Sequence, residues 1–181
     1  MNQRTLLSAK EVDITLNRLS CQLIENHQDF KNTVIIGLQP RGAQLAKRLR
    51  DLLIQFTNVD SVDLGSLDTT FFRDDFRRRD EPIKANQTKI DFLVENKRVI
   101  FIDDVLYTGR SVRAALDAVN SFGRPASVEL LVLINRRFSR HLPIEPNYVG
   151  KTIDSVASER VVVYWSEQDG EDKVELMSGK P

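Results

Sequence analysis

Two adjacent aspartates, Asp103 and Asp104, stand between a largely apolar run and a short segment of hydroxyl residues and glycine. The apolar run, residues 98–102, is typical of a buried strand in a parallel sheet. Open α/β sheets bind their ligands at the carboxyl ends of such strands, and paired carboxylates accept hydrogen bonds from vicinal hydroxyls such as those of a ribose. The pair therefore predicts a sugar site at the edge of a sheet.

The segment that follows the aspartates has the composition of a phosphate site. Thr108 and Ser111 offer hydroxyl donors, Gly109 allows close approach of the backbone, and a helix is predicted to follow. Backbone N–H groups at a helix N-terminus attract anions, and the helix dipole adds to the attraction. An isolated Asp-Asp or Thr-Gly pair is most often only a strand end and a turn, but a diol site joined to a phosphate site indicates a phosphorylated sugar.

Length and composition limit the protein class. With 181 residues, of which 41% are apolar and 29% charged, the chain is large enough for one globular domain with its own core. Lys+Arg and Asp+Glu both number 26, so a polyanion would have to bind a local basic patch. The single cysteine, Cys21, excludes an intrachain disulfide, and no apolar run has the length of a membrane span, so we expect a cytoplasmic protein.

The hydrophobic periodicity predicts alternating strands and helices around a parallel, right-handed α/β sheet. Residues 73–89 are charged, lack apolar periodicity and contain Pro82, which indicates a long loop. Residues 161–165 and 173–177 flank Asp169-Gly170 and predict a hairpin. The other expected elements are a helix from a capping box at Ser8 to about Asn26, strands at 33–37, 62–72, 98–102 and 127–134, and helices at 43–53 and 112–122, the last one capped by Gly123.

The segment DDVLYTGRSVRAALDA, residues 103–118, resembles the pyrimidine-operon attenuator (PyrR-like) family, whose members are also uracil phosphoribosyltransferases of type I. Five further segments resemble that family in the same order: MNQRTLLSAKEVDITLNRL, GLQPRGAQLAKRL, LDTTFFRDDF, LPIEPNYVGKTI and ASERVVV. The resemblance implies a single domain over residues 1–181 with the type I phosphoribosyltransferase fold. In that fold, helices flank a central, mainly parallel sheet, with a small hood at about 135–160 and a mobile lid loop at about 73–89.

The resemblance also implies a role for each matching residue. Asp103 and Asp104 would hold the ribose hydroxyls and favour the positive charge that develops on the sugar, while Arg73 and Arg77 in the lid would cover the pyrophosphate. Mg²⁺ would be held mainly through the sugar pyrophosphate. The expected substrate contacts are Pro40, Arg41 and Gly42 for pyrophosphate, Val105, Leu106, Tyr107, Thr108, Gly109, Arg110 and Ser111 for the 5-phosphate, and Asn135, Arg136, Val161 and Val162 for the base.

Two details refine this expectation. The family's pyrophosphate loop often holds a non-proline cis peptide, which here would join Pro40 to Arg41. Purine-using relatives have a carboxylate general base at the position of Tyr107, and a tyrosine is a poor base near neutral pH. The substrates expected are therefore 5-phosphoribosyl 1-pyrophosphate and uracil, with UMP as product.

Regulation of RNA is the second implied activity. Attenuators of this family bind leader messenger RNA of pyrimidine genes in response to uridine nucleotides and form homodimers or homotetramers. Arg18 and Arg140 match basic RNA contacts, whereas Asn17, Cys21 and Glu145 depart from the family pattern. Three hypotheses stay open: a uracil phosphoribosyltransferase with or without attenuator function, an RNA-binding regulator with little catalysis, and a salvage phosphoribosyltransferase for purine bases.

Overall fold

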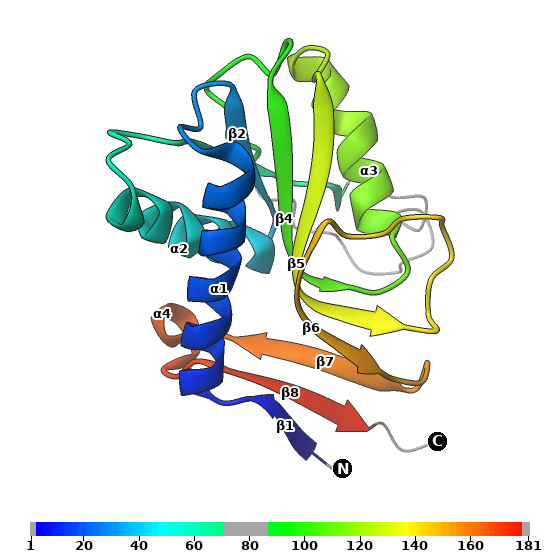
Figure 1. Ribbon diagram of the computed structural model, residues 1–181. Helices are drawn as coiled ribbons and strands as arrows, with labels where there is room; N and C mark the ends of the chain where they lie inside the picture. Colours follow the sequence, from blue (N-terminus) through cyan, green and yellow to red (C-terminus); the bar gives the residue numbers. More distant parts are fainter. Residues whose placement is uncertain (1–2, 71–86, 179–181) are drawn as a thin grey trace.

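The computed structural model describes residues 3–70 and 87–178, which build two sheets (Figure 1). The larger sheet is parallel throughout, with strand order β3-β2-β4-β5-β6. The smaller sheet is antiparallel, with order β1-β8-β7. The strands are β1 (Gln3–Leu7), β2 (Thr33–Leu38), β3 (Asp63–Leu67), β4 (Arg98–Leu106), β5 (Ser127–Arg137), β6 (Tyr148–Asp154), β7 (Glu159–Tyr164) and β8 (Lys173–Ser178).

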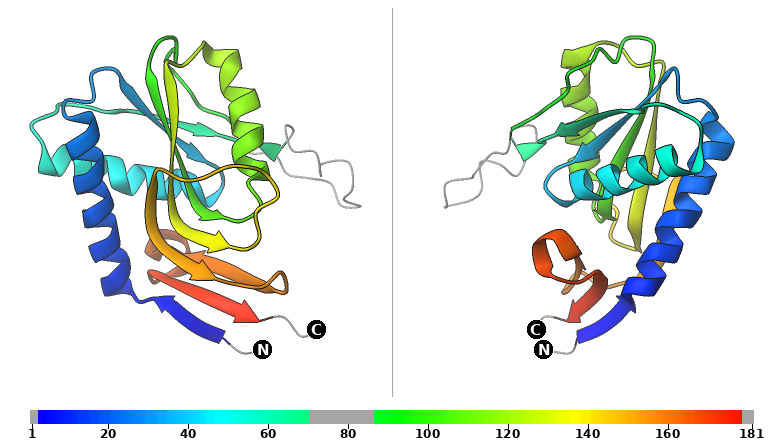
Figure 2. Two further views of the ribbon diagram at one scale, coloured as in Figure 1. Left: turned by 45° about the vertical axis from the view of Figure 1, so that its right-hand side comes forward. Right: turned by 90° about the vertical axis from the view of Figure 1, so that its left-hand side faces the viewer.

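Helices cover both faces of the larger sheet (Figures 1 and 2), which confirms the predicted α/β class. Helices α1 and α2 lie on one face and α3 on the other. A one-turn helix, α4, joins β7 to β8, and a 3₁₀ turn extends α3. The bounds are α1 (Ala9–His27), α2 (Arg41–Phe56), α3 (Arg110–Val119), the 3₁₀ turn (Asn120–Phe122) and α4 (Ser166–Asp169). No helix in the described ranges is long and apolar enough to span a membrane.

Two groups of buried side chains hold these layers together. Ile100 and Ile102 of β4 pack in the group beneath α1 and α2, while Val99 and Phe101 pack in the group beneath α3. This alternation follows from the period of two along a strand. The group beneath α1 and α2 also contains residues of the small sheet, such as Leu176. Both sheets therefore share one core.

The first helix begins as its capping box predicts. The backbone N–H of Ser8 donates to the Glu11 carboxylate at 2.8 Å, which supplies a partner for a group that the helix itself leaves unpaired. Cys21, the single cysteine of the chain, is exposed on this helix.

Several strand bounds differ from those predicted. β4 does not end at the aspartates but continues to Leu106, because β5 pairs with it as far as Leu106 and Asn135. β5 likewise continues to Arg137, where it pairs with β6. β3 ends at Leu67 instead of reaching residue 72, whose own placement is outside the described residues. β1 and β6 were not predicted, because a short strand without strict alternation leaves little pattern.

The small sheet of β1, β8 and β7, together with α4, is called the hood below. The predicted hood at about 135–160 overlaps it only at residues 159–160, because residues 135–137 and 148–154 extend the larger sheet. The predicted pairing of β7 with β8 is correct. The connection between them is longer than a tight Asp-Gly turn, because it includes α4. Gly170 ends this helix in the left-handed region, at φ 84°.

Candidate active site

A cavity of about 160 Å³ lies where β4 passes into α3. Its wall contains Asp103 and every residue that we predicted to surround the 5-phosphate: Val105, Leu106, Tyr107, Thr108, Gly109, Arg110 and Ser111, with Val112 beside them. Helix α3 begins at this wall, so its positive end is directed at the cavity. The shape and the helix end together form a cradle for an anion.

The backbone of the cradle is held in place by the segment that follows β5. Gly109 is the N-cap of α3 and has φ 89°, a conformation that glycine adopts without steric cost. A Cβ atom on Gly109 would lie 3.2 Å from Ile144 Cδ1. The N–H of His141 donates to the Thr108 carbonyl at 3.1 Å. The loop between β5 and β6 therefore closes one side of the cradle.

The two aspartates lie in the last part of β4 and are partly buried. Asp103 Oδ1 accepts the N–H of Asp104 at 2.9 Å, and Asp104 Oδ1 accepts the N–H of Val105 at 3.0 Å. Burial raises the pKa of Asp104 above its ordinary value, while Asp103, the Val105 N–H and the charge of Arg41 act against this rise. One of these acidic groups, Asp103, thus lines the phosphate-sized cavity, and the other, Asp104, follows it in β4 near Arg41.

The predicted pyrophosphate loop precedes α2. Its cis peptide bond joins Gln39 to Pro40, so the predicted cis bond between Pro40 and Arg41 is wrong by one position. The tertiary amide before proline tolerates the cis form far better than other peptide bonds. Gly42, predicted to let the backbone approach the pyrophosphate, also has a packing role. A Cβ atom there would lie 2.5 Å from the Ile102 carbonyl oxygen and 2.9 Å from Asp103 Cα, so glycine lets α2 begin directly against the aspartate strand.

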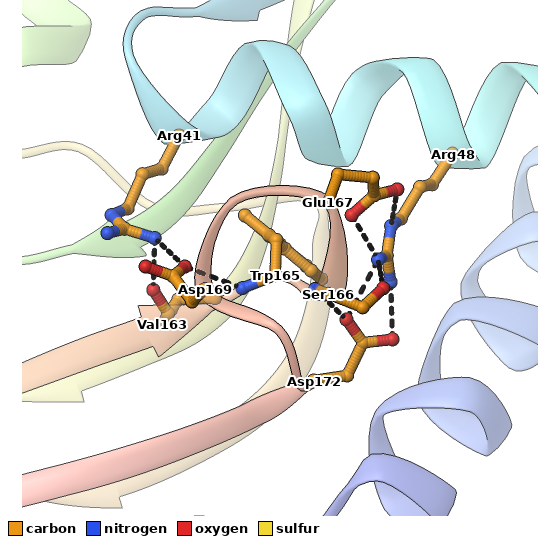
Figure 3. A network of polar contacts seen from close by, with 8 residues as sticks. All are labelled: Arg41, Arg48, Val163, Trp165, Ser166, Glu167, Asp169 and Asp172. Atoms are coloured by element: carbon orange, nitrogen blue, oxygen red, sulfur yellow. Dashed lines mark hydrogen bonds and ion pairs between the residues drawn. The ribbon is translucent and has the colours of Figure 1, made fainter.

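Arg41 extends from the start of α2 to the hood (Figure 3). Its Nη1 donates to the Val163 carbonyl at 2.5 Å and to Asp169 Oδ2 at 3.0 Å. The hydrogen bond with Asp169 is the main cause of the raised pKa of Arg41, and the charge of Asp104 contributes to the same rise. Sequence reasoning missed Asp169, which we had placed in a turn. A signal was present, since Arg41 and Arg48 are two helical turns apart and the acids follow β7.

Asn135 and Arg136, predicted to contact the base, lie at the end of β5 and are buried. Arg136 Nε donates to Ser155 Oγ at 2.7 Å, and its Nη2 donates to the carbonyls of Val156 and Glu159 at 3.0 Å each. The guanidinium also lies 4.0 Å from the ring centroid of Tyr107. Arg136 therefore fixes Tyr107 against the loop between β6 and β7.

Arg140, a predicted RNA contact, points inward. Its Nη1 donates to the Tyr107 carbonyl at 2.5 Å and its Nη2 to Asn135 Oδ1 at 2.7 Å. Burial lowers the pKa of Arg140. Arg18, the other predicted RNA contact, is exposed on α1 and donates to the carbonyl of Gly150 at 2.7 Å. Arg18 also donates to the Val149 carbonyl and to Gln22, so the two arginines differ in exposure and not in whether they have partners.

A second cavity, of about 600 Å³, shares Tyr107 with the cradle. Val161 and Val162, the expected backbone contacts of the base, lie in β7, the hood strand closest to the larger sheet (Figure 1). β8 pairs with one edge of β7, and the carbonyl oxygen of Val163 in β7 accepts a hydrogen bond from Arg41. Arg73 and Arg77 lie outside the described residues. The second cavity is lined by Tyr107, Phe138, Ser139, Arg140, His141, Asp154, Ser155, Val156, Ala157 and Glu159.

Comparison with solved structures places this geometry in a known fold. Hypoxanthine phosphoribosyltransferases from Staphylococcus aureus and Trypanosoma cruzi superpose with TM-scores of 0.70 and 0.72, at 22% and 16% sequence identity. The alignments cover 98% of this chain in both cases, and 93% and 97% of those chains. At this level of identity the likeness concerns the fold alone.

Sequence comparison identifies the family. The family described as the phosphoribosyl transferase domain matches residues 2–168. A bifunctional PyrR protein of Synechocystis is 42% identical over 174 residues, 96% of either chain, and one of Enterococcus faecalis is 38% identical over 179 residues, 99% of either chain. The chain therefore belongs to the phosphoribosyltransferases and, among them, to the bifunctional PyrR family.

Proposed function

We propose that this protein transfers the phosphoribosyl group of 5-phosphoribosyl 1-pyrophosphate to uracil and releases UMP and pyrophosphate. The observation that carries the proposal is the cavity between β4 and α3, with anion donors and Asp103 in its wall and Asp104 next to Asp103 in β4. No other site in the described residues combines a helix N-terminus with paired acids at the carboxyl end of a parallel strand. A phosphorylated sugar matches both parts.

Each part of the site then has one task in the reaction. The cradle holds the 5-phosphate, and Asp103 and Asp104 accept hydrogen bonds from the ribose hydroxyls. The bond between C1 and the pyrophosphate oxygen breaks, and N1 of uracil bonds to C1 from the opposite face and loses its proton to solvent. The carboxylates stabilise the positive charge that develops on the sugar. Arg41 binds the departing pyrophosphate, and we propose that Arg73 and Arg77 exclude water from it.

Mg²⁺ fits the donor set of this site. The ion usually keeps several waters and binds through one or two carboxylates together with substrate phosphates. Asp103 lines the cradle and Asp104 follows it in β4, so two carboxylates are near where the sugar diphosphate would lie. When bound, Mg²⁺ would be held mainly by oxygens of the pyrophosphate and ribose and would reduce the negative charge of the leaving group.

Uracil is the proposed base because Tyr107 occupies the wall between the two cavities. Arg136 lies over the Tyr107 ring, so the phenol is fixed at the position where purine-using relatives are expected to have a carboxylate. A tyrosine provides little general-base assistance near neutral pH, which disfavours bases that need a proton removed by the protein. Hypoxanthine is therefore the poorer substrate in this proposal.

Product formation from the sugar diphosphate with uracil, hypoxanthine or orotate tests the substrate. With Mg²⁺ present, uracil should give UMP, and hypoxanthine and orotate should each react at least about 100-fold more slowly, the discrimination typical of a site that cannot pair a substrate's polar groups. Chelation of Mg²⁺ should abolish the reaction with uracil. Faster turnover with hypoxanthine than with uracil would support the salvage hypothesis instead.

We further propose that the protein regulates pyrimidine genes by binding their leader RNA when a uridine nucleotide is bound. The support is that the closely similar relatives are named bifunctional and that Arg18 is exposed. Arg140 supports it less, because its side chain is only partly exposed and contacts Tyr107 and Asn135 in the interior. Location in the cytoplasm and assembly into a homodimer or homotetramer stay predictions.

Filter binding of leader RNA with and without UMP tests this second function. UMP should strengthen binding, and Arg18→Gln should weaken it and reduce the slope of log K against log salt by about 1, as expected for one lost phosphate contact. Arg113→Gln on α3 is the control, because Arg113 pairs only with Asp117 among the described residues, one turn along the same helix. Equal loss with both variants, or no RNA binding with UMP present, would contradict the proposal.

A further inference from the structure

We infer that Asp169, in the hood, is a positioning residue that holds Arg41 so that the remaining donors of this arginine receive the pyrophosphate group (Figure 3). The inference rests on the proposed function, because it takes Arg41 as a contact of the sugar diphosphate. It adds a residue from a distant part of the chain to the site.

The carboxylate of Asp169 has a fixed place that does not depend on Arg41. Asp169 Oδ2 accepts the backbone N–H of Trp165 at 2.9 Å, and the N–H of Asp169 donates to the Trp165 carbonyl at 2.7 Å. The Trp165 side chain is fully buried in the shared core. Movement of this carboxylate would therefore disturb a packed residue.

A second arginine fixes α4 to α2. Arg48 donates to Ser166 Oγ at 2.9 Å and to the two Asp172 oxygens at 2.7 and 2.8 Å, and it also pairs with Glu167. Its guanidinium lies 4.6 Å from the ring centroid of Trp165. Arg48 and Arg41 are seven residues apart on α2, so both face the hood (Figure 3). The hood is therefore held by Arg48, and Arg41 is not needed for that purpose.

Arg41 itself is fixed at both ends. Its backbone is adjacent to Gly42, which packs against Ile102 and Asp103. At the other end, Nη1 donates to both Val163 and Asp169. Arg41 therefore spans the aspartate strand and the hood.

Two nitrogens of Arg41 are left for a ligand. Within residues 3–70 and 87–178, no hydrogen bond engages its Nε or Nη2. The guanidinium is also near enough to Asp104 for the two charges to interact. A planar guanidinium that is held by one nitrogen presents the other two as a fork, which is the geometry that binds phosphate oxygens best. Asp169 would orient this fork toward the sugar site.

The opposite effect has a different signature. If Asp169 instead withheld Arg41 from the ligand, removal of its charge would strengthen binding of the sugar diphosphate. The side chains of Arg41 and Asp169 are 31% and 22% exposed, so the pair is partly screened by solvent and its loss should change affinity only modestly. The sign of the change therefore decides between orientation and withdrawal.

The test compares Asp169→Asn with Asp172→Asn in the full-length protein. Steady-state kinetics with 5-phosphoribosyl 1-pyrophosphate, uracil and Mg²⁺ should show KM for the sugar diphosphate raised about fivefold by Asp169→Asn, as expected for one partly exposed ion pair. KM for uracil and kcat should stay within about twofold. Asp172 binds Arg48 and does not contact Arg41. Asp172→Asn should therefore leave all three values near those of the unmodified protein.

A second comparison uses Arg41→Lys, which keeps the charge but lacks the fork. In that background Asp169→Asn should have no further effect on KM for the sugar diphosphate. Three results would overturn the inference: a KM that is unchanged or lower in Asp169→Asn, an equal rise in Asp172→Asn, or the same fivefold rise in the Arg41→Lys background. Failure of the proposed function is distinct, because the unmodified protein would then show no turnover and no calorimetric binding of the sugar diphosphate.

Discussion

Replacing Asp103 and Asp104 together by asparagine is expected to lower turnover by at least about 100-fold, as the loss of an electrostatic stabiliser in an active site typically does. Both carboxylates lie where the ribose must bind if the cradle holds its 5-phosphate. Asparagine keeps the size and an acceptor oxygen but removes the charge that stabilises the reacting sugar. Rates of UMP formation measure the effect, and near-normal turnover would remove the assigned role.

The stability of Asp104→Asn separates this effect from unfolding. Burial raises the folded-state pKa of Asp104 above the ordinary 3.8, so the native state binds more protons than the unfolded state as pH rises from 3.8 to the folded pKa. The free energy of unfolding therefore falls as pH rises through this range, and the ionised carboxylate of Asp104 keeps it lower at neutral pH. Asp104→Asn should therefore unfold at or above the temperature of the unmodified protein at pH 7, and any gain should vanish below pH 3.8. A lower unfolding temperature at pH 7 would mean that lost packing explains the lost activity.

Gly42→Ala is expected to be the most damaging single methyl addition to the site. The new Cβ would meet the Ile102 carbonyl oxygen at 2.5 Å and Asp103 Cα at 2.9 Å, and both are backbone atoms that cannot rotate away. Overpacking of this kind typically costs about 1–3 kcal/mol. The new methyl group would also push α2 away from the aspartate strand. Small displacements of reacting groups have large kinetic effects, so we expect turnover to fall at least tenfold as well.

Gly170→Asn provides the control for that substitution. Nothing lies within 4 Å of a Cβ atom at Gly170, and asparagine tolerates the left-handed region better than other residues. Thermal unfolding and uracil kinetics of both variants should show a large change for Gly42→Ala and a small one for Gly170→Asn. Similar losses in the two variants would show that the hood turn, and not the contact with Asp103, limits function.

The cradle could be predicted from sequence because its determinants are local. A buried strand, two acids, a glycine and a helix start follow one another within fourteen residues, from Arg98 to Ser111, and each leaves a pattern in composition. The length of β4 could not be predicted, because its continuation through the aspartates depends on pairing with β5 up to Asn135. Likewise, the burial of Arg136 depends on Ser155 and Glu159, which no local pattern connects to it.

The contact between Arg41 and Asp169 shows the limit most clearly. The two residues are 128 positions apart, and the spacing of Arg41 and Arg48 on their helix does not indicate which acid each arginine meets. Asp169-Gly170 is a strong turn signal, and the turn does form, but only after a helical turn that presents the carboxylate to α2. The turn signal at Asp169-Gly170 therefore predicted the local conformation but did not indicate the contact of Asp169 with Arg41.

The extended course of β4 through both aspartates limits how this enzyme can evolve. Asp103 lines the cavity at α3 and lies against Gly42 of α2, and the charge of Asp104 acts on Arg41 of the same helix. An insertion or deletion of one residue in β4 would exchange the two layers for every later side chain. A change of two residues would keep the layers but move both aspartates by about 7 Å along the strand, away from Gly42 and the start of α3, so the length of β4 is constrained as well as its residue identity.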